Sequence, residues 1–407
     1  MGSSLPPPDL LVLSGHLPAS LDSWKTPRVF VVSQRNSSRS RALRLECCSL
    51  IVVSRRKSSR SRALHPECCS LIVIGSRSVS RVVYTADMKQ FISHQSALEF
   101  WRGASAQNAL AGKKLRVKVL PTKPLEAGDL HTDNPWGLAM PLHILVGSAN
   151  ARKAARGLRC HISSGVFPGG SFIQGDSGLA ISSPELCFVQ MATELSLIEL
   201  IKLGYEFCGS YRLSDQKDPD KGFSTDLPLT STVQLDSFLS KTQGLKGHKQ
   251  ALRALRFIAN GSASPMETIL TMLLTLPYRL GGYAFPMPQL NYPVGVSAHS
   301  SKASGRQKYC CDLYWPDKRI DVEYDSDAFH TKSEQIAHDA IRRNDLLSMG
   351  ISVVTVSRKQ LFSTTGMHAV TEVLRKSLSR RVQYPIPEFY ARRLALRKQL
   401  FRLTPTS

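Results

Sequence analysis

The sequence lacks long hydrophobic segments. Mostly apolar runs such as LLVL at residues 10–13 and ISVVTV at residues 351–356 fall far short of the roughly 20 residues that a transmembrane helix needs. No basic segment precedes the LLVLSG run, although one would be expected in a secretory signal peptide. We therefore expect a cytoplasmic protein that does not associate with a membrane.

Cysteines at zinc-finger spacing are also absent. The nine cysteines form three adjacent pairs and three single residues, and no two of them are separated by the two residues typical of zinc sites. Neighbouring cysteines rarely form a disulfide with each other. The pattern therefore predicts reduced thiols, in agreement with a cytoplasmic setting.

Acidic residues are scarce overall. The chain has 31 Asp and Glu against 53 Lys and Arg, which gives a net charge of +22 over 407 residues. This excess indicates a polyanionic partner, and charge alone does not distinguish nucleic acid from an anionic membrane. With 42% hydrophobic residues the chain can build two domains with ordinary cores.

A tandem repeat occupies part of residues 1–87. Residues 37–57 (SSRSRALRLECCSLIVVSRRK) return almost unchanged as residues 58–78. Two copies cannot enclose a solenoid core, so the repeat favours a disordered basic extension over a folded array. Two further interpretations remain open, namely a tail that binds RNA or DNA and a segment translated from upstream of the true start, since Met88 begins a globular pattern.

Two β-like runs nearer the C-terminus are joined by a tight turn. Residues 308–315 are rich in Tyr, Cys and Leu, and residues 319–324 alternate apolar with charged side chains. The turn residues Pro-Asp-Lys lie between them. So short a connection makes the strands antiparallel neighbours, which brings Asp312 and Glu323 to the same end of the sheet.

Asp312 and Glu323 therefore predict a metal site. Two close carboxylates repel each other unless a cation lies between them, and Mg²⁺ prefers carboxylate oxygens and keeps waters that can attack a phosphodiester. Asp325, Asp327 and His330 add potential donors nearby. The alternative is a solvated acidic face, but acids gathered in so basic a chain favour a metal site beside a phosphate-binding surface.

A basic helix and a further strand follow. Residues 333–349 show helical spacing of apolar positions, and Gly350 is a typical stop. Arg342 and Arg343 are predicted to approach the DNA backbone. An equally favoured alternative pairs Asp339 with one of these arginines along the helix. The β-branched residues 351–356 predict a buried strand.

This order of residues resembles the Vsr-like branch of the PD-(D/E)XK nuclease superfamily over residues 264–362. The matching positions are Asp312, the VEYD sequence at 322–325, His330 and Asp339-x-x-Arg342. The resemblance implies a restriction-endonuclease-like αβββαβ core and a DNA endonuclease that depends on Mg²⁺ or Mn²⁺. Its elements would be a helix from residue 265, strands at 288–294, 308–315 and 319–324, a helix at 333–349 and a strand at 351–356.

The resemblance also implies roles for single residues. Asp312 and Glu323 would hold the metal ion, with Asp325 and Glu267 as further catalytic carboxylates. Asp325 stands where the superfamily has a lysine, so His330 would act as ligand or general base. Glu267 follows Ser264 at a helix-start signal, which makes a capping role for Glu267 equally favoured.

Residues 88–236 resemble the C-terminal portion of AbiEi-type antitoxins, which implies a protein partner in a bacterial toxin–antitoxin or defence system. Strands are expected at residues 141–146, 159–163 and 171–173, and Ser183 opens a long helical pattern that continues to residue 209. The DNA-reading winged helix expected in front of such a region is not evident. A scaffold domain is therefore the favoured interpretation.

Two basic helical segments complete the chain. Residues 237–263 predict a basic helical connector, and residues 389–403 predict a helix with Phe389, Leu396, Leu400 and Leu403 on one stripe. Contact with DNA, docking on the core and adsorption to a membrane surface all suit the last helix. Docking with an exposed basic face is favoured.

The sequence thus predicts an α/β (α+β) protein in four segments. They are a disordered extension (1–87), a smaller α/β scaffold domain (88–236), a connector (237–263) and a nuclease domain (264–407). The predicted activity is hydrolysis of DNA phosphodiester bonds by an endodeoxyribonuclease. The alternative is a non-catalytic DNA-binding or antitoxin-like regulator that retains the nuclease fold.

Overall fold

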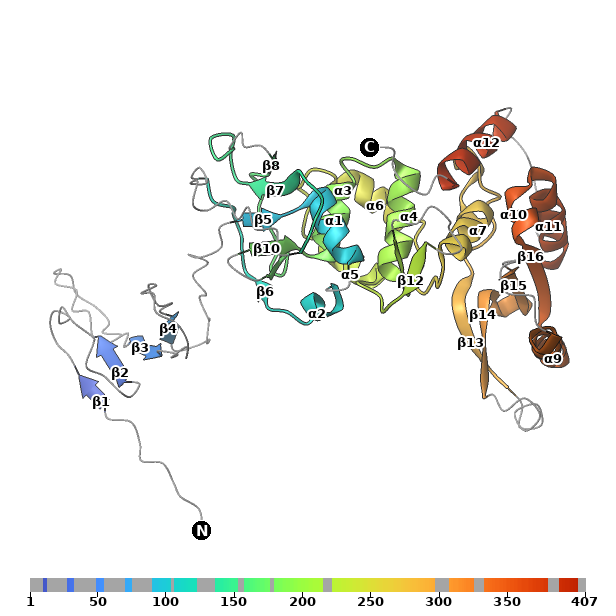
Figure 1. Ribbon diagram of the computed structural model, residues 1–407, viewed down its shortest axis with the longest axis horizontal. Coiled ribbons are helices and arrows are strands. Elements are labelled where there is room, and N and C mark those ends of the chain that lie inside the picture. Colours follow the sequence, from blue (N-terminus) through green and yellow to red (C-terminus); the bar gives the residue numbers. More distant parts are fainter. Residues whose placement is uncertain are drawn as a thin grey trace, which may run out of the picture. The chain divides into compact units, whose positions relative to one another are not determined.

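A computed structural model of the chain divides into two compact units, Met1–Asp87 and Met88–Ser407, which we describe separately (Figure 1). In the second unit the structure describes residues 90–103, 106–122, 136–152, 157–175, 179–214, 222–296, 307–325, 333–379 and 388–401, with the backbone alone at 333–339. In the first unit it describes only the backbones of four short strands.

Those four strands form one sheet in the order β1-β2-β3-β4. They are β1 (Leu10–Val12), β2 (Arg28–Val32), β3 (Ser49–Ser54) and β4 (Ser70–Ile74). β3 and β4 are the equivalent SLIV segments of the two repeat copies, and they pair antiparallel with Leu50 opposite Ile74. The rest of residues 1–87, and with it most of the predicted disordered extension, lies outside the described residues.

The second unit contains a mixed six-stranded sheet in the order β6-β9-β10-β5-β7-β8. β5 runs parallel to β10 and β7 parallel to β8, while the other neighbours are antiparallel. Every residue of β7 and of β10 is buried. The strands are β5 (Gln90–Ile92), β6 (Lys114–Leu115), β7 (Leu142–Val146), β8 (Leu158–Ile162), β9 (Phe172–Gln174) and β10 (Leu179–Ser182).

Four helices lie between these strands or directly after them in the chain. They are α1 (His94–Arg102), α2 (Ala106–Leu110), α3 (Pro184–Met191) and α4 (Leu197–Cys208). The sequence predicted one continuous helical pattern from Ser183 to residue 209, and this was wrong. Ser196 interrupts it, because its hydroxyl accepts a hydrogen bond from the backbone of Glu199 and the Glu199 carboxylate accepts one from the backbone of Ser196. Such a reciprocal cap starts a new helix.

The predicted connector, residues 237–263, contains the end of α5 (Thr232–Leu239) and all of α6 (His248–Leu255). Gly247, with a left-handed φ of 87°, lies between them, and a Cβ at that position would stand 2.1 Å from the backbone oxygen of Val189. Glycine alone tolerates both conditions. A short pair, β11 (Tyr211–Leu213) and β12 (Phe223–Thr225), precedes the connector.

The C-terminal part follows the order αβββαβ, and the α/β class is confirmed. Its sheet has the order β13-β14-β15-β16, with β13, β14 and β15 antiparallel and β16 parallel to β15. The elements are α7 (Pro265–Thr275), β13 (Gln289–Gly295), β14 (Lys308–Trp315), β15 (Ile320–Asp325), α9 (Ser333–Ser348) and β16 (Ser352–Ser357).

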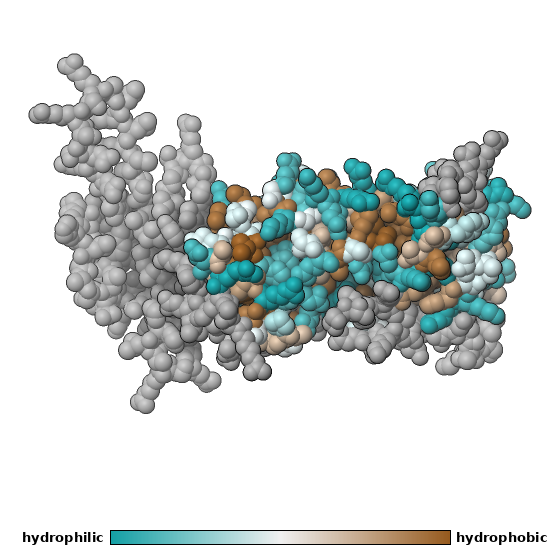
Figure 2. All heavy atoms as spheres, turned by 90° about the horizontal axis from the view of Figure 1, so that it is seen from above, coloured by the Kyte–Doolittle hydropathy of each residue, from teal (hydrophilic) through white to brown (hydrophobic). Residues whose placement is uncertain are grey.

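Two hydrophobic clusters cover the two faces of this sheet. Leu313, Val322 and Val356 share a cluster with the buried residues of α7. Tyr309 and Cys311 share the other cluster with Leu346 of α9. Two helices that the sequence did not predict, α10 (Arg358–Phe362) and α11 (Thr364–Ser377), follow β16. On the face seen in Figure 2, hydrophilic residues alternate with hydrophobic patches.

The last helix, α12 (Phe389–Leu400), docks on the core as predicted, because Phe389, Leu396 and Leu400 are buried. Leu403 lies outside the described residues. The predicted basic face of α12 is exposed at Arg392 and Lys398, but Arg393 and Arg397 are buried. The guanidinium of Arg393 lies 3.8 Å from the Tyr283 ring centre and 4.1 Å from that of Phe389, and such cation–π contacts stabilise a buried cation.

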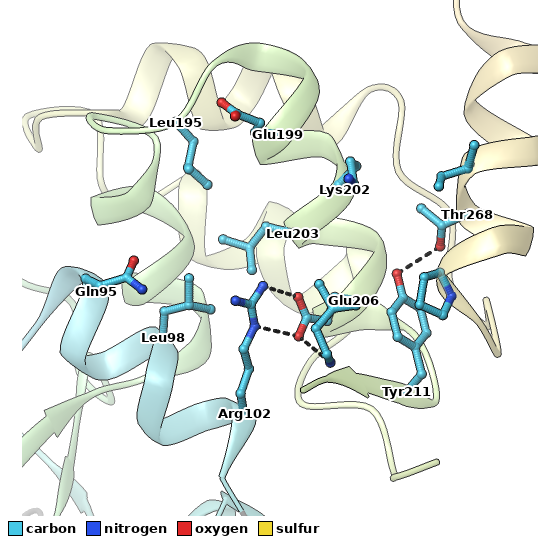
Figure 3. A pocket seen from close by; sticks show the side chains of 13 residues that line it. Gln95, Leu98, Arg102, Leu195, Glu199, Lys202, Leu203, Glu206, Tyr211 and Thr268 are labelled. Atoms are coloured by element: carbon cyan, nitrogen blue, oxygen red, sulfur yellow. Dashed lines mark hydrogen bonds and ion pairs between the residues drawn. The ribbon is translucent and has the colours of Figure 1, made fainter. Parts of the chain in front are cut away.

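Helix α4 lies between the six-stranded and four-stranded sheets of the second unit, as Figure 1 shows. A cavity of about 70 Å³ lies beside this helix (Figure 3). In the cavity wall Arg102 donates from Nε and Nη2 to the two carboxylate oxygens of Glu206, at 2.8 and 2.7 Å. Glu206 is buried, so this bidentate pair fixes α1 to α4. Tyr211 and Thr268 share a hydrogen bond of 3.0 Å between their hydroxyls, which ties β11 to α7.

Within the described ranges, each helix is too short or too polar to cross a membrane.

Candidate active site

The carboxylates predicted for catalysis gather where β14 and β15 separate. The ladder between these strands pairs Trp315 with Ile320 and ends with Leu313 opposite Val322. One step further, the Asp312 carboxylate oxygen Oδ2 accepts a hydrogen bond of 3.0 Å from the backbone N–H of Tyr324. The Asp312 carboxylate thus accepts the hydrogen bond that a backbone carbonyl would accept in a continuous ladder. This bond directs the side chain of Asp312 toward the part of β15 that carries Glu323.

Glu267 caps helix α7, one of the two roles that the sequence left open, and its predicted catalytic role stays a prediction. Its backbone N–H donates to the Ser264 hydroxyl at 3.1 Å, and its carboxylate accepts from that hydroxyl and from the backbone of Ala263, each at 3.0 Å. Asn291 of β13 donates a further bond of 2.7 Å. The same buried carboxylate is close enough to Asp312 to raise its pKa. Helix α7 therefore presents a carboxyl group of fixed orientation to the sheet.

Asp321 belongs to this group and was not among the predicted site residues. It precedes Glu323 by two positions on β15, so both side chains lie on the same face. Asp321 has no exposed surface, and neither of its carboxylate oxygens has a well-formed hydrogen bond in the described part of the chain. Its polar neighbours are Glu323 and the thiol of Cys311. A buried carboxylate without partners is costly, which points to a missing proton or cation.

Burial and mutual repulsion shift the pKa values of these acids upward. Burial, followed by the charges of Glu267 and Glu323, raises the pKa of Asp312 to about 8. Burial, followed by the charge of Glu323, raises the pKa of Asp321 to about 9. Burial also raises the pKa of Glu267. Without a cation the group therefore retains protons at neutral pH, and a bound cation would favour the charged forms.

The two arginines predicted to contact DNA lie on α9 beside this group. Arg342 forms an ion pair with Glu323, with 2.6 Å between Nη2 and Oε1, and also donates to the backbone oxygen of Cys310. Arg343 is exposed and donates a long bond of 3.4 Å to the Thr355 hydroxyl on β16. The side chain of Asp339, their alternative partner, lies outside the described residues. Arg342 thus neutralises Glu323, and Arg343 faces solvent.

Of the remaining predicted donors, the structure describes Asp325 alone. Asp325 is the last residue of β15 and is half-buried. His330 and Asp327, the other donors that the sequence suggested, lie outside the described residues. The structure therefore brings together Asp312, Glu323 and Glu267 and adds Asp321.

The donor set fits a hard cation held by few protein ligands. In the described part of the chain, no three of these carboxylates have oxygens within 4.8 Å of one another. Mg²⁺ is usually held by one or two carboxylates together with water and substrate phosphates, so a closed cage is not required. The unpartnered oxygens of Asp321 supply the buried charge that such an ion would compensate.

No protein-family model matches the chain, and no solved structure matches it significantly. Two proteins of Mycobacterium tuberculosis are similar to it: uncharacterized protein MT2308 of strain CDC 1551 / Oshkosh and uncharacterized protein Rv2248 of strain ATCC 25618 / H37Rv. Each is 23% identical over 123 residues, which are 30% of this chain and 41% of the relative. The chain thus spans less than half the length of these bacterial relatives.

Proposed function

We propose that the protein is an endonuclease that hydrolyses phosphodiester bonds in DNA with the aid of Mg²⁺ or Mn²⁺. The observation that supports this function most is the convergence of Asp312, Glu323 and Asp321 at the separation of two strands, with Glu267 beside them. The net charge of +22 suits a polyanionic substrate. The proposal includes a cytoplasmic setting and a protein partner in a toxin–antitoxin or defence system.

Asp312 and Glu323 would hold the ion in this proposal, with Asp321 as a further ligand. When bound, the ion would activate a water molecule and neutralise the charge that develops on the phosphate. The backbone N–H of Tyr324 fixes the Asp312 carboxylate in one orientation. Asn291 and Ser264 do the same for Glu267 through hydrogen bonds. Fixed orientation is what a catalytic carboxylate needs.

The residues of α9 and the segment after β15 complete the proposal. Exposed Arg343 contacts the DNA backbone, and the ion pair with Arg342 holds the Glu323 carboxylate in place. Asp325 and His330 serve as a further ligand and as the general base, since no lysine follows Glu323 at the second position.

A second candidate function is a DNA-binding or antitoxin-like regulator that keeps this fold without turnover. The ion pair between Arg342 and Glu323 favours it, because an arginine already compensates a carboxylate that the metal ion would use. The two functions differ in one respect: removal of the Asp312 charge stops a nuclease and leaves DNA binding by a regulator unchanged.

Plasmid cleavage by the full chain tests the proposal. Supercoiled DNA is incubated with the wild type, Asp312→Asn and Glu323→Gln in Mg²⁺ or Mn²⁺, and DNA binding is measured in parallel. We expect both variants to lose cleavage by about 100-fold or more, the size typical of removing a group that stabilises the transition state. Asp317→Asn is the matched control, because this acid is exposed in the turn between β14 and β15.

Two results would contradict the nuclease assignment. One is a wild type that nicks no DNA with either metal. The other is cleavage by both variants at the wild-type rate. Wild-type DNA binding without cleavage, unchanged in Asp312→Asn, would establish the regulator instead.

A further inference from the structure

A second cluster of donors lies in the six-stranded sheet, far along the chain from the acidic residues. His94 starts α1, His161 lies on β8, and Glu194 lies in the turn between α3 and α4. One donor atom from each of these residues lies within 4.8 Å of the other two. Among the described residues, these three side chains are the group of His, Cys, Asp or Glu whose donor atoms come close enough together to hold one metal ion.

The two imidazoles stack face to face. The ring centres of His94 and His161 are 3.5 Å apart and the ring planes differ by 12°. A ring nitrogen of each is oriented by a neighbour: Nδ1 of His94 lies 3.0 Å from the Ser93 hydroxyl, and Nε2 of His161 lies 3.1 Å from Nδ1 of His143. A hydrogen bond on one nitrogen fixes the ring and leaves the other nitrogen for coordination.

The backbone around His94 is also held in an unusual conformation. His94 has a φ of 47°, in the left-handed region that side chains other than glycine rarely adopt. Its backbone N–H donates to Oε1 of Gln190 on α3 at 3.0 Å, and Gln190 in turn donates to the Ser182 hydroxyl at 3.0 Å. Strain that the surrounding structure maintains in this way is typical of functional sites.

Burial favours the uncharged form of the histidines. Burial, followed by His161 and His143, lowers the pKa of His94 to about 2. Burial is also the main reason that the pKa values of His143 and His161 fall to about 4. The uncharged imidazole is the form that coordinates metal ions. Burial raises the pKa of Glu194, and a bound cation would favour its charged form.

An ion could reach this cluster from solvent. A cavity of about 480 Å³ is lined by His94, His161, Gln190 and Thr193, among other residues. Glu194 is itself exposed. Arg152 and Lys246 line the same cavity, so an anionic group could bind next to the ion at a position that the protein leaves open.

We infer that His94, His161 and Glu194 bind a divalent transition-metal ion, with Zn²⁺ and Co²⁺ as the probes that test it. Two imidazoles and one carboxylate form the three-ligand set that leaves one position of a tetrahedral ion open. Imidazole nitrogens suit Zn²⁺ and its neighbours in the first transition series, whereas carboxylate clusters suit Mg²⁺ and Mn²⁺. The site is thus chemically different from the acidic group on β14 and β15.

Metal titration of the full chain, purified without a histidine tag and stripped with a chelator, tests the inference. Zn²⁺ binding is followed by calorimetry and Co²⁺ binding by its visible absorption, which is strong for four-coordinate nitrogen-ligated ions and weak for six-coordinate oxygen-ligated ones. The variants are His161→Ala and Glu194→Gln, since both side chains reach solvent and their replacement spares the buried His94. Matched controls are His368→Gln and Glu372→Gln on α11.

We expect the wild type and both controls to bind one Co²⁺ ion with the strong spectrum. His161→Ala and Glu194→Gln should bind Zn²⁺ at least about 10-fold more weakly and lose that spectrum. Asp312→Asn should retain it, which separates this site from the acidic group. The inference is overturned if the wild type shows no strong Co²⁺ spectrum, or if both variants keep the wild-type affinity and spectrum.

Discussion

The acidic group and the histidine cluster respond to burial in opposite directions. Burial disfavours charge in both, so it raises the pKa values of Asp312 and Asp321 to about 8 and 9 and lowers those of the histidines to between about 2 and 4. At neutral pH the imidazoles are therefore ready to coordinate an ion. The carboxyl groups must first release protons, so their affinity for a cation depends on pH.

The strongest test of this contrast is a crossed pair of variants. Asp312→Asn should abolish DNA cleavage, by about 100-fold or more, and leave the Co²⁺ spectrum unchanged. His161→Ala should abolish the Co²⁺ spectrum and leave DNA cleavage unchanged. Plasmid cleavage and absorption spectroscopy on the same protein samples check both. If either variant removed both properties, the two sites would not be independent.

Removal of the Asp321 carboxylate should stabilise the metal-free protein while it weakens cleavage. Because the pKa of Asp321 is about 9 in the folded chain, folding at pH 8 must place a proton on this buried carboxyl group, whereas an amide needs none. We expect Asp321→Asn to raise the free energy of unfolding in EDTA at pH 8 by on the order of 1 to 3 kcal/mol. Urea unfolding measures it, with the exposed Asp317→Asn as control. A loss of stability would show that Asp321 is satisfied by the protein alone.

The same residue predicts how stability depends on pH in EDTA. Its pKa is about 9 in the folded chain and about 3.9 in an unfolded one, so between these values the folded state holds a proton that the unfolded state has released. The free energy of unfolding should therefore fall as pH rises through this window. Asp321→Asn should flatten the slope. Urea unfolding midpoints between pH 5 and 9 provide the measurement. If stability depended on pH equally in the wild type and in Asp321→Asn, the pKa of Asp321 would not be raised.

The smallest expected effect concerns Glu267, which caps α7 and also lies beside Asp312. Ser264→Ala removes the hydroxyl that caps α7 and should cost about 1 kcal/mol of stability, with cleavage largely retained. Glu267→Gln keeps an acceptor for the cap and removes the charge beside Asp312, so cleavage should fall more than stability. Thermal unfolding and plasmid cleavage of both variants decide this. Equal loss of cleavage in both would assign Glu267 to the cap alone.

The C-terminal sheet could be predicted because its signals are local. The alternation in β15, the Pro-Asp-Lys turn before it and the Ser264 cap of α7 each depend on neighbouring residues. Asp321 escaped prediction because a polar residue in an alternating strand indicates a solvent-facing side chain. Packing of α9 against this face, through Leu346, buries it instead. That packing cannot be derived from the strand itself.

The histidine cluster left no signal in the sequence. His94, His161 and Glu194 come from three separate elements, with none of the short spacings that identify metal motifs. The pairing of β5 with β7 and of β7 with β8 brings the two histidines together, and the packing of α3 against α1 adds Glu194. The burial of Arg393 was hidden for the same reason, since the ring that covers it belongs to Tyr283.

Helix α12 determines where the chain can be shortened. Arg397 donates to the backbone oxygen of Leu361 in α10, and Lys202 of α4 donates to the backbone oxygen of Leu400, at 2.8 and 2.9 Å. The helix thus joins the part that bears the acidic group to the part that bears the histidines. A fragment that ended after β16 would lack α12 and would expose the surfaces that this helix covers in both parts. A minimal version for crystallisation or for fusion to another domain must therefore extend through Phe401.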